Sequence, residues 1–80
     1  MNKTIMSAIR AHALEESPRE CCGFVIQDGR KQRYLRVRNS HANPTEHFRI
    51  DSEEWANAED SGEIIRVIHS HPGDGARPIP

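Results

Sequence analysis

The stretch "EIIRVIHSH", residues 63–71, decides the fold of this chain of 80 amino acids. Its near-continuous apolar run predicts a strand buried on both faces, in the middle of an α/β sheet. Because side chains two positions apart in a strand point to the same face, His69 and His71 are expected to project together. Ile65 and Val67 are expected on that same face, so the histidine pair continues the apolar side of the strand.

Pro72 follows directly and ends the predicted strand, because proline cannot donate to a sheet ladder. The two histidines therefore stand at the carboxyl edge of the sheet, where α/β proteins commonly hold their sites. Two imidazoles at this spacing can reach one metal ion, since each nitrogen bonds zinc at about 2 Å. Ser70 is expected on the opposite face. His-x-His by itself leaves open a metal site or two surface histidines.

The expected elements before this strand are a helix, a β-hairpin, a short strand and a second helix, which together indicate an α/β fold. Their residues are, in chain order, a helix at 2–17, hairpin strands at 21–26 and 32–38 around Asp28-Gly29, a short strand at 48–50 and a helix at 51–62. A chain of this size buries only about 60–65% of its unfolded surface. We therefore expect one small domain covering residues 1–80.

Individual side chains refine the two predicted helices. The apolar stripe of the first helix consists of Ile5, Ile9 and Ala13, with Met6 and Leu14 beside them. His12 is expected on the exposed side of that helix, and Asn2 can cap it. In the second helix, Asp51 and Glu54 have capping-box spacing, and Gly62 stands where a helix commonly ends. Trp55 is expected to pack against the core.

Composition excludes several classes of protein. The formal net charge is −1, so no overall field indicates binding to nucleic acid or to a membrane. The basic residues of the hairpin predict a solvated edge, with an acidic substrate as the alternative; they are Arg30, Lys31, Arg33, Arg36 and Arg38. Adjacent Cys21 and Cys22 are expected to be reduced and unpaired. No signal peptide or membrane span is evident, which predicts a cytoplasmic protein as synthesised.

Glu20 stands directly before the apolar run "CCGFVI", near one end of the predicted sheet. Its position alone fits either a solvated charge or a base for a hydrolytic site. Taken together, "PRECCGFVI" and the downstream "HSHP" resemble the JAMM (MPN+) family of zinc metallopeptidases, which has a cytidine-deaminase-like fold. Within that family they look most like the amino-terminal domain of tail assembly proteins of lambda-type phages. The leading helix, the hairpin and the helix before the histidine strand match as well.

The resemblance implies a role for each matching residue. Glu20 matches the general base, and His69 and His71 match two ligands of a Zn²⁺ ion that activates water. The implied activity is hydrolysis of a peptide or isopeptide bond, in a tail protein or a peptidoglycan peptide, with phage tail components as partners and the virion tail as a further location. One alternative is a non-catalytic MPN-like assembly module. Another is a bacterial JAMM peptidase that acts on a ubiquitin-like or sulfur-carrier tail.

The chain departs from the family pattern at its carboxyl end. The family aspartate that serves as third zinc ligand would fall just beyond Pro80, and Ile79 stands where the family has an oxyanion-binding serine. Asp74 is expected to be a turn residue rather than a ligand. We therefore expect a domain truncated at its end, with weak zinc binding and slow or absent hydrolysis. An exposed sheet edge would also favour a homodimer. His41 and His47 flank a loop that could approach the site, although their spacing does not indicate it.

Overall fold

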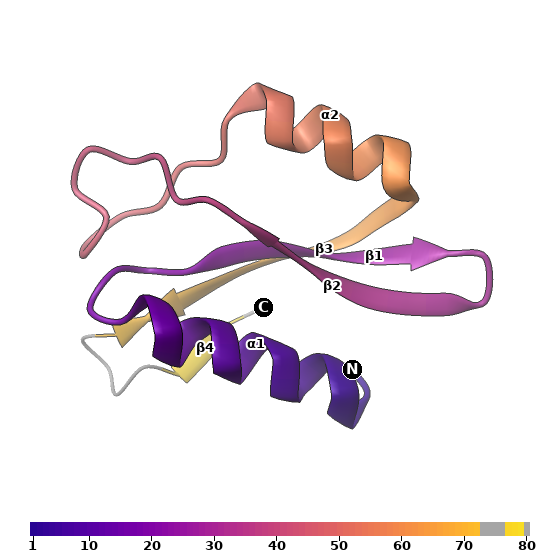
Figure 1. The fold of residues 1–80 in the computed structure, drawn as a ribbon, viewed down its shortest axis with the longest axis horizontal. Helices are drawn as coiled ribbons and strands as arrows, with labels where there is room; N and C mark the ends of the chain where they lie inside the picture. The colour runs from indigo at the N-terminus through magenta and orange to yellow at the C-terminus, as the bar shows by residue number, and fades with distance from the viewer. Residues whose placement is uncertain (73–76, 80) are drawn as a thin grey trace.

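The computed structural model describes residues 1–72 and 77–79, which form one four-stranded antiparallel sheet with a helix on each face (Figure 1). The elements are α1 (Lys3–Glu16), β1 (Cys22–Asp28), β2 (Lys31–Val37), α2 (Ser52–Ser61), β3 (Glu63–His71) and β4 (Arg77–Ile79). The strands lie in the order β2-β1-β3-β4. The predicted α/β fold class is confirmed. Neither helix in the described part of the chain is long and apolar enough to cross a membrane.

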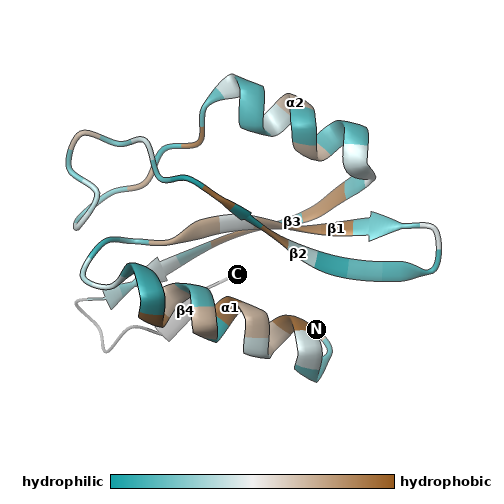
Figure 2. Ribbon diagram, in the orientation of Figure 1, coloured by the Kyte–Doolittle hydropathy of each residue, from teal (hydrophilic) through white to brown (hydrophobic). Residues whose placement is uncertain are grey.

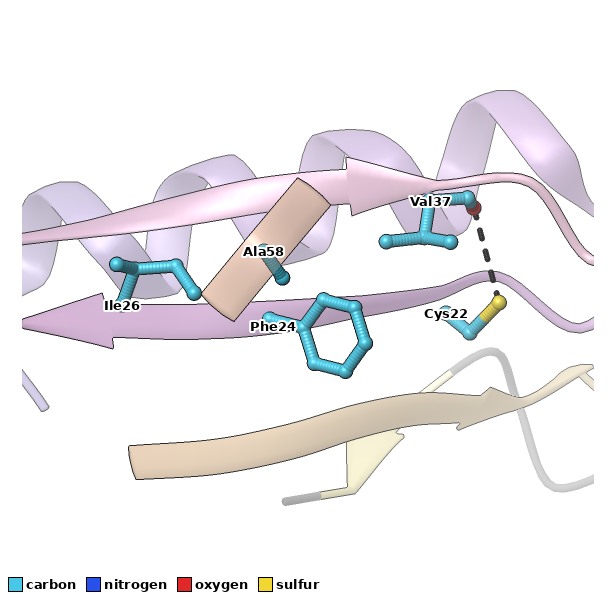
Figure 3. Packing of buried hydrophobic residues seen from close by; sticks show 5 residues of the cluster. All are labelled: Cys22, Phe24, Ile26, Val37 and Ala58. Atoms are coloured by element: carbon cyan, nitrogen blue, oxygen red, sulfur yellow. Dashed lines mark hydrogen bonds between the residues drawn. The ribbon is translucent and has the colours of Figure 1, made fainter. Parts of the chain in front are cut away.

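The core consists of two apolar clusters, one on each face of the sheet. The α2-face cluster contains Cys22, Phe24, Ile26, Val37 and Ala58 (Figure 3). The α1-face cluster contains Ile5, Ile9, Val25 and Ile68. Successive residues of β1 supply opposite clusters because strand side chains alternate between faces. Figure 2 shows apolar colours along the middle of the sheet and hydrophilic colours at the end that carries the β1–β2 hairpin turn.

The strand buried on both faces is therefore β1 rather than β3. The prediction for residues 63–71 was wrong in this respect, since Ile65 is 39% exposed and Arg66 is also exposed. In β3 only Ile68 and Ser70 are buried. The physical reason is the extent of pairing, because β2 and β3 flank β1 along nearly its whole length, whereas β4 pairs with β3 only at residues 69–71.

A bulge in the pairing of β1 with β3 changes which residues of β3 share a face. The register shifts between Val25 and Ile26, and Ile65 falls at the shift. Two residues of one strand then oppose one of the other, which reverses the alternation beyond that point. As a result Ile64, and not Ile65, packs against the α2-face cluster together with Val67. The expected position of Ile65 beside the histidines was wrong, whereas that of Val67 is confirmed.

The hairpin of β1 and β2 forms at the predicted turn. Gly29 has a φ of 62°, a left-handed conformation that glycine adopts without a steric penalty. Leu35 and Val37 pack on the α2-face cluster, while Arg36 is exposed, as the alternation predicts. Arg36 forms an ion pair with Glu15 of α1. Because both side chains are largely exposed, this pair stabilises the fold only slightly.

α1 begins as predicted, because the Asn2 side chain accepts a hydrogen bond from the backbone N–H of Ile5 at 2.8 Å. Two of its side chains lie differently from the prediction. Leu14 is 70% exposed, and His12 is only 5% exposed. His12 can be buried because its Nδ1 lies 2.7 Å from the hydroxyl of Tyr34, which satisfies the ring nitrogen.

The buried His12 predicts a pH dependence of stability. Burial lowers its pKa below the ordinary value of 6.5, and the positive charge of Arg36 lowers it further. The unfolded chain then takes up a proton at higher pH than the folded chain, so folding stability falls as the pH drops below 6.5 toward the folded pKa. We expect His12→Gln to reduce the loss of unfolding free energy between about pH 7 and about pH 5, measured by urea titration. Equal losses in both proteins would contradict this assignment.

Residues 48–50 form no strand, contrary to the prediction. Phe48 and Ile50 instead pack against the α2-face cluster from the loop that joins β2 to α2. The segment has backbone pairing only at Arg49, whose carbonyl accepts from the N–H of Ser40 at 3.0 Å. Apolar side chains that fill a gap beside the sheet can thus produce a strand-like pattern without a strand.

α2 has the predicted ends but not the predicted capping bond. Asp51 occupies the N-cap position without a side-chain bond to the helix. Its carboxylate accepts instead from the Ser40 hydroxyl at 2.9 Å, which attaches α2 to the preceding loop. At the other end Gly62 follows the helix with a φ of 149°, a conformation that residues with a Cβ rarely adopt. Trp55 packs its ring against Phe24, with centroids 4.7 Å apart, which confirms its packing role.

Candidate functional site

Glu20 and the histidine pair meet at one end of the sheet. The register of β1 with β3 pairs Cys22 with His69, so Glu20, just before β1, lies at the same end. The side chain of Glu20 is buried, and its Oε1 lies 3.7 Å from Nδ1 of His69. The sequence alone left Glu20 either solvated or near an end of the sheet; the structure buries it beside His69.

Ser70 connects the histidine strand to the segment that carries Glu20. The Ser70 hydroxyl accepts a hydrogen bond from the backbone N–H of Cys21 at 2.8 Å. In return the backbone N–H of Ser70 donates to the carbonyl of Cys21 at 3.1 Å. Ser70 is fully buried. Since Cys21 follows Glu20 directly, this pair of hydrogen bonds sets the position of the carboxylate relative to the histidines.

Asn39 holds the loop between β2 and α2 against the same segment. Its Nδ2 donates to the carbonyls of Glu20 at 2.9 Å and His47 at 3.0 Å. Its Oδ1 accepts from the backbone N–H of His41 at 3.0 Å. The backbone N–H of Glu20 in turn donates to the carbonyl of Pro44 at 2.7 Å. Backbone bonds therefore fix Glu20 on both sides and bring the loop beside it.

The loop and the sheet end enclose a cleft of about 330 Å³. Glu20, His69 and His71 line it from the sheet, and His41, Glu46, His47 and Phe48 line it from the loop. The approach of His41 and His47 to the site was left open by the sequence, because it depends on bonds made by Asn39. No spacing pattern reveals such contacts, since they join segments that are distant along the chain.

Aromatic contacts set the orientation of the rings in the cleft. Phe48 stacks on His69, with centroids 4.6 Å apart and the ring planes within 15°. The rings of His69 and His71 lie 4.7 Å apart, as expected for two histidines on one face of a strand. Stacking on Phe48 restricts rotation of the His69 ring and so keeps its Nδ1 directed at Glu20.

The donor atoms suit a zinc ion in part. Nδ1 of His69 is buried without a hydrogen-bond partner, a state that costs about 1–3 kcal/mol. At 3.7 Å the Glu20 oxygen is too distant for a hydrogen bond, so this nitrogen is available to a metal ion. Imidazole is a common zinc ligand, and a neighbouring carboxylate is the usual base for a hydrolytic metal site. Within residues 1–72 and 77–79, however, no three His, Cys, Asp or Glu side chains are grouped to hold an ion. Asp74 lies outside the described residues.

The two cysteines near the site are packed in the interior of the fold. Both are buried and unpaired, as predicted. Burial raises the pKa of the Cys21 thiol, and burial together with neighbouring Cys21 raises the pKa of Cys22 to about 12. These thiols are therefore protonated packing groups at neutral pH.

Position 79 lies beside the site in the sheet. β4 pairs Ile79 with His69, opposite the strand that carries Glu20. The family resemblance places an oxyanion-binding serine at this position, and isoleucine has no side-chain donor. An isoleucine at this position therefore cannot take the hydrogen-bonding role of that serine.

Comparison with known proteins supports the family resemblance. Residues 2–78 match the family described as prokaryotic homologs of the JAB domain. The chain is 47% identical over 78 residues to tail tip assembly protein K of Escherichia phage N15, which covers 98% of the chain and 32% of that protein. It is 34% identical over 82 residues to the CysO-cysteine peptidases of Mycobacterium bovis and Mycobacterium tuberculosis, covering 92% of the chain and 56% of each relative. No solved structure matches the chain.

The chain thus spans about a third of the phage protein and just over half of each mycobacterial peptidase. The relatives confirm both parts of the resemblance drawn from "PRECCGFVI" and "HSHP", the JAB/MPN-type domain and the likeness to a phage tail assembly protein. The two helices and the antiparallel sheet are consistent with a partial JAB/MPN fold. The chain belongs to the family of prokaryotic homologues of the JAB domain.

Proposed function

We propose that this chain is a zinc-dependent peptidase domain of a phage tail assembly protein, with Glu20 as general base and His69 and His71 as zinc ligands. The observation that carries the proposal is the buried Glu20 carboxylate facing the partnerless Nδ1 of His69. The likeness to a tail tip assembly protein supports the setting, and the likeness to two named peptidases supports the reaction. The substrate is a peptide or isopeptide bond of a protein or of peptidoglycan.

The chemistry divides between the ion and the side chains. Zinc, when bound, lowers the pKa of water and polarises a carbonyl oxygen. Glu20 takes the proton of the attacking water and then passes it to the leaving nitrogen. It thus acts first as a general base and then as a general acid. The backbone of Glu20 is held by its bonds to Pro44 and Asn39, which fix the segment that carries this buried carboxylate.

The number of protein ligands determines how tightly zinc is expected to bind. Two imidazoles are one fewer than the three protein ligands of an open catalytic zinc site. We expect the third ligand to come from outside residues 1–72 and 77–79, and the 80-residue chain to bind zinc weakly and to hydrolyse slowly. Residues 1–80 would then form one JAMM/MPN domain whose third zinc ligand is not among the described residues.

A zinc titration of single-site variants tests the ligand assignment. We expect wild type to bind one equivalent, and His69→Ala and His71→Ala each to weaken binding by more than about tenfold. His47→Ala is the matched control, because it removes an exposed imidazole from the same cleft. Isothermal calorimetry on the metal-free protein gives the affinities. An equal loss in all three variants, or in none, would contradict the assignment.

A second reaction setting is supported by the mycobacterial relatives. Their name describes a peptidase for CysO-cysteine, and they share 34% identity with the chain. In this setting Glu20, His69 and His71 would catalyse the removal of an amino acid from the tail of a carrier protein. A panel of cell-wall peptides and carrier-protein tails, compared by cleavage rate, separates the two settings.

A non-catalytic assembly module is the remaining alternative, and the lack of a three-ligand group in the described part of the chain is the observation that favours it. Such a module would keep its fold and its role in tail assembly after His69→Ala and His71→Ala together. Loss of hydrolysis alone in that double variant would support the enzyme instead.

A further inference from the structure

We propose that His41 is a substrate-binding residue whose Nε2–H donates a hydrogen bond to an acceptor oxygen of the bound peptide. This inference rests on the proposed peptidase function, because it names the chemistry that the same cleft recognises. The oxygen belongs either to a peptide carbonyl or to a terminal carboxylate. Both sources present the same chemistry to an N–H donor.

One hydrogen bond determines the tautomer of His41. The backbone N–H of Asn43 donates to Nδ1 of His41 at 2.9 Å. A backbone N–H can only donate, so this nitrogen must offer a lone pair. A neutral imidazole has a single N–H, which therefore lies on Nε2. Nε2 of His41 is consequently a donor, and it is not free to bind a metal ion, since a ligating nitrogen also needs a lone pair.

The ring of His41 is fixed in place before any ligand binds. Its backbone N–H is held by Oδ1 of Asn39 at 3.0 Å, and its ring packs against that of His47 with centroids 4.9 Å apart. Asn39 also bonds the carbonyl of Glu20 at 2.9 Å. The donor and the general base thus share one support. A donor that is already in position costs no reorganisation when a substrate oxygen arrives.

The side-chain donors that this cleft can offer to a substrate oxygen are its four histidines, and His41 is the one whose donor nitrogen is set by a hydrogen bond from the backbone. Glu20 and Glu46 are acceptors when ionised, and Phe48 has no hydrogen-bonding group. Glu46 is further occupied within the loop, where its Oε2 accepts from the side chain of Asn43 at 3.0 Å. Carbonyl and carboxylate oxygens of a peptide cannot pair with these groups. His41 lines the same cleft, and it is only half-buried, so an incoming oxygen can reach the ring.

The tautomer can be tested without metal or activity. A two-dimensional NMR spectrum of the metal-free chain with ¹⁵N-labelled histidine distinguishes the two ring nitrogens. We expect His41 to show a protonated Nε2 and an unprotonated Nδ1. The opposite tautomer, or a ring protonated on both nitrogens near neutral pH, would overturn the inference.

Peptide binding tests the recognition itself. The probes are acetyl-trialanine with a free terminal carboxylate and the same peptide as its terminal amide, titrated into metal-free protein and followed by NMR. We expect His41→Ala to weaken binding by roughly three- to tenfold, the effect of one hydrogen bond. His41→Gln, which restores an N–H donor, should stay within about twofold of wild type. Gln32→Ala, an exposed change on the hairpin, is the control and should have no effect.

The two probes identify the source of the oxygen. A loss confined to the carboxylate peptide assigns the contact to a chain end, and an equal loss for both assigns it to a peptide carbonyl. Unchanged affinity for both peptides in His41→Ala, or no binding by wild type, would overturn the inference. Failure of the peptidase proposal is a separate result, because peptide binding that depends on His41 without any zinc-dependent cleavage would reject the reaction and keep the contact.

Discussion

Glu20→Gln is expected to lower the rate of zinc-dependent peptide cleavage by about 10²–10⁴-fold, the usual contribution of a positioned general base. Glutamine has nearly the same shape but cannot take up a proton from water. The fold should be unaffected, because the hydrogen bonds of Glu20 to Pro44 and Asn39 use backbone atoms. Single-turnover cleavage at saturating zinc, with circular dichroism to check folding, measures the effect.

The matched control is Glu46→Gln, which removes the other carboxylate of the cleft. Glu46 is exposed and bonds only to Asn43 among the described contacts, whereas Glu20 is buried beside His69. Cleavage by Glu46→Gln should remain within about threefold of wild type, in line with the small net effect of an exposed charge. Similar losses in the two variants would remove the special role of Glu20 and indicate a general effect of charge in the cleft.

Phe24→Ala is expected to reduce the free energy of unfolding by about 3–5 kcal/mol. Phe24 is fully buried in the α2-face cluster (Figure 3), and its ring packs against that of Trp55. Domains are typically stable by about 5–15 kcal/mol, with small ones at the lower end, so this loss would leave much of the protein unfolded. Urea unfolding followed by circular dichroism gives the value.

Leu14→Ala serves as the comparison for Phe24, because it also shortens an apolar side chain. Leu14 is 70% exposed, and a surface change of this kind usually alters stability by less than about 0.5 kcal/mol. Phe24 also follows Cys22 by two positions in β1, and Cys22 pairs with His69 in the sheet. A partly folded Phe24→Ala protein should therefore lose zinc binding along with its core. A loss of stability below about 1 kcal/mol would show that the α2-face cluster is not the main core.

Local patterns predicted most elements well, because they depend on neighbours in the chain. The first helix, the turn at Gly29, the second helix and the histidine strand are all present where the spacing indicated. The errors occur where a distant segment decides the outcome. His12 is buried because Tyr34 of another element can bond its ring, and residues 48–50 pack as a loop because Asn39 and Ser40 take up the backbone of Arg49.

The assignment of the most buried strand shows the same limit. A run of apolar residues in β3 resembles a strand covered on both faces, but burial depends on the order of strands in the sheet. β1 is paired on both sides along nearly its whole length, whereas β4 covers only residues 69–71 of β3, and the bulge at Ile65 leaves part of β3 exposed. Strand order and bulges arise from pairing between segments, so hydropathy along a single segment does not reveal them.

By itself the sequence determined which chemical groups are available: two histidines on one face of a strand, a glutamate ahead of a second strand, and the family to which they point. Their arrangement was decided by the tertiary structure. Antiparallel pairing of β1 with β3 placed Glu20 3.7 Å from His69, and Asn39 brought His41 and His47 to the same cleft. The physical reason is that the sequence specifies the side chain at each position, whereas a site forms only when the hydrogen bonds of the folded chain hold distant residues together.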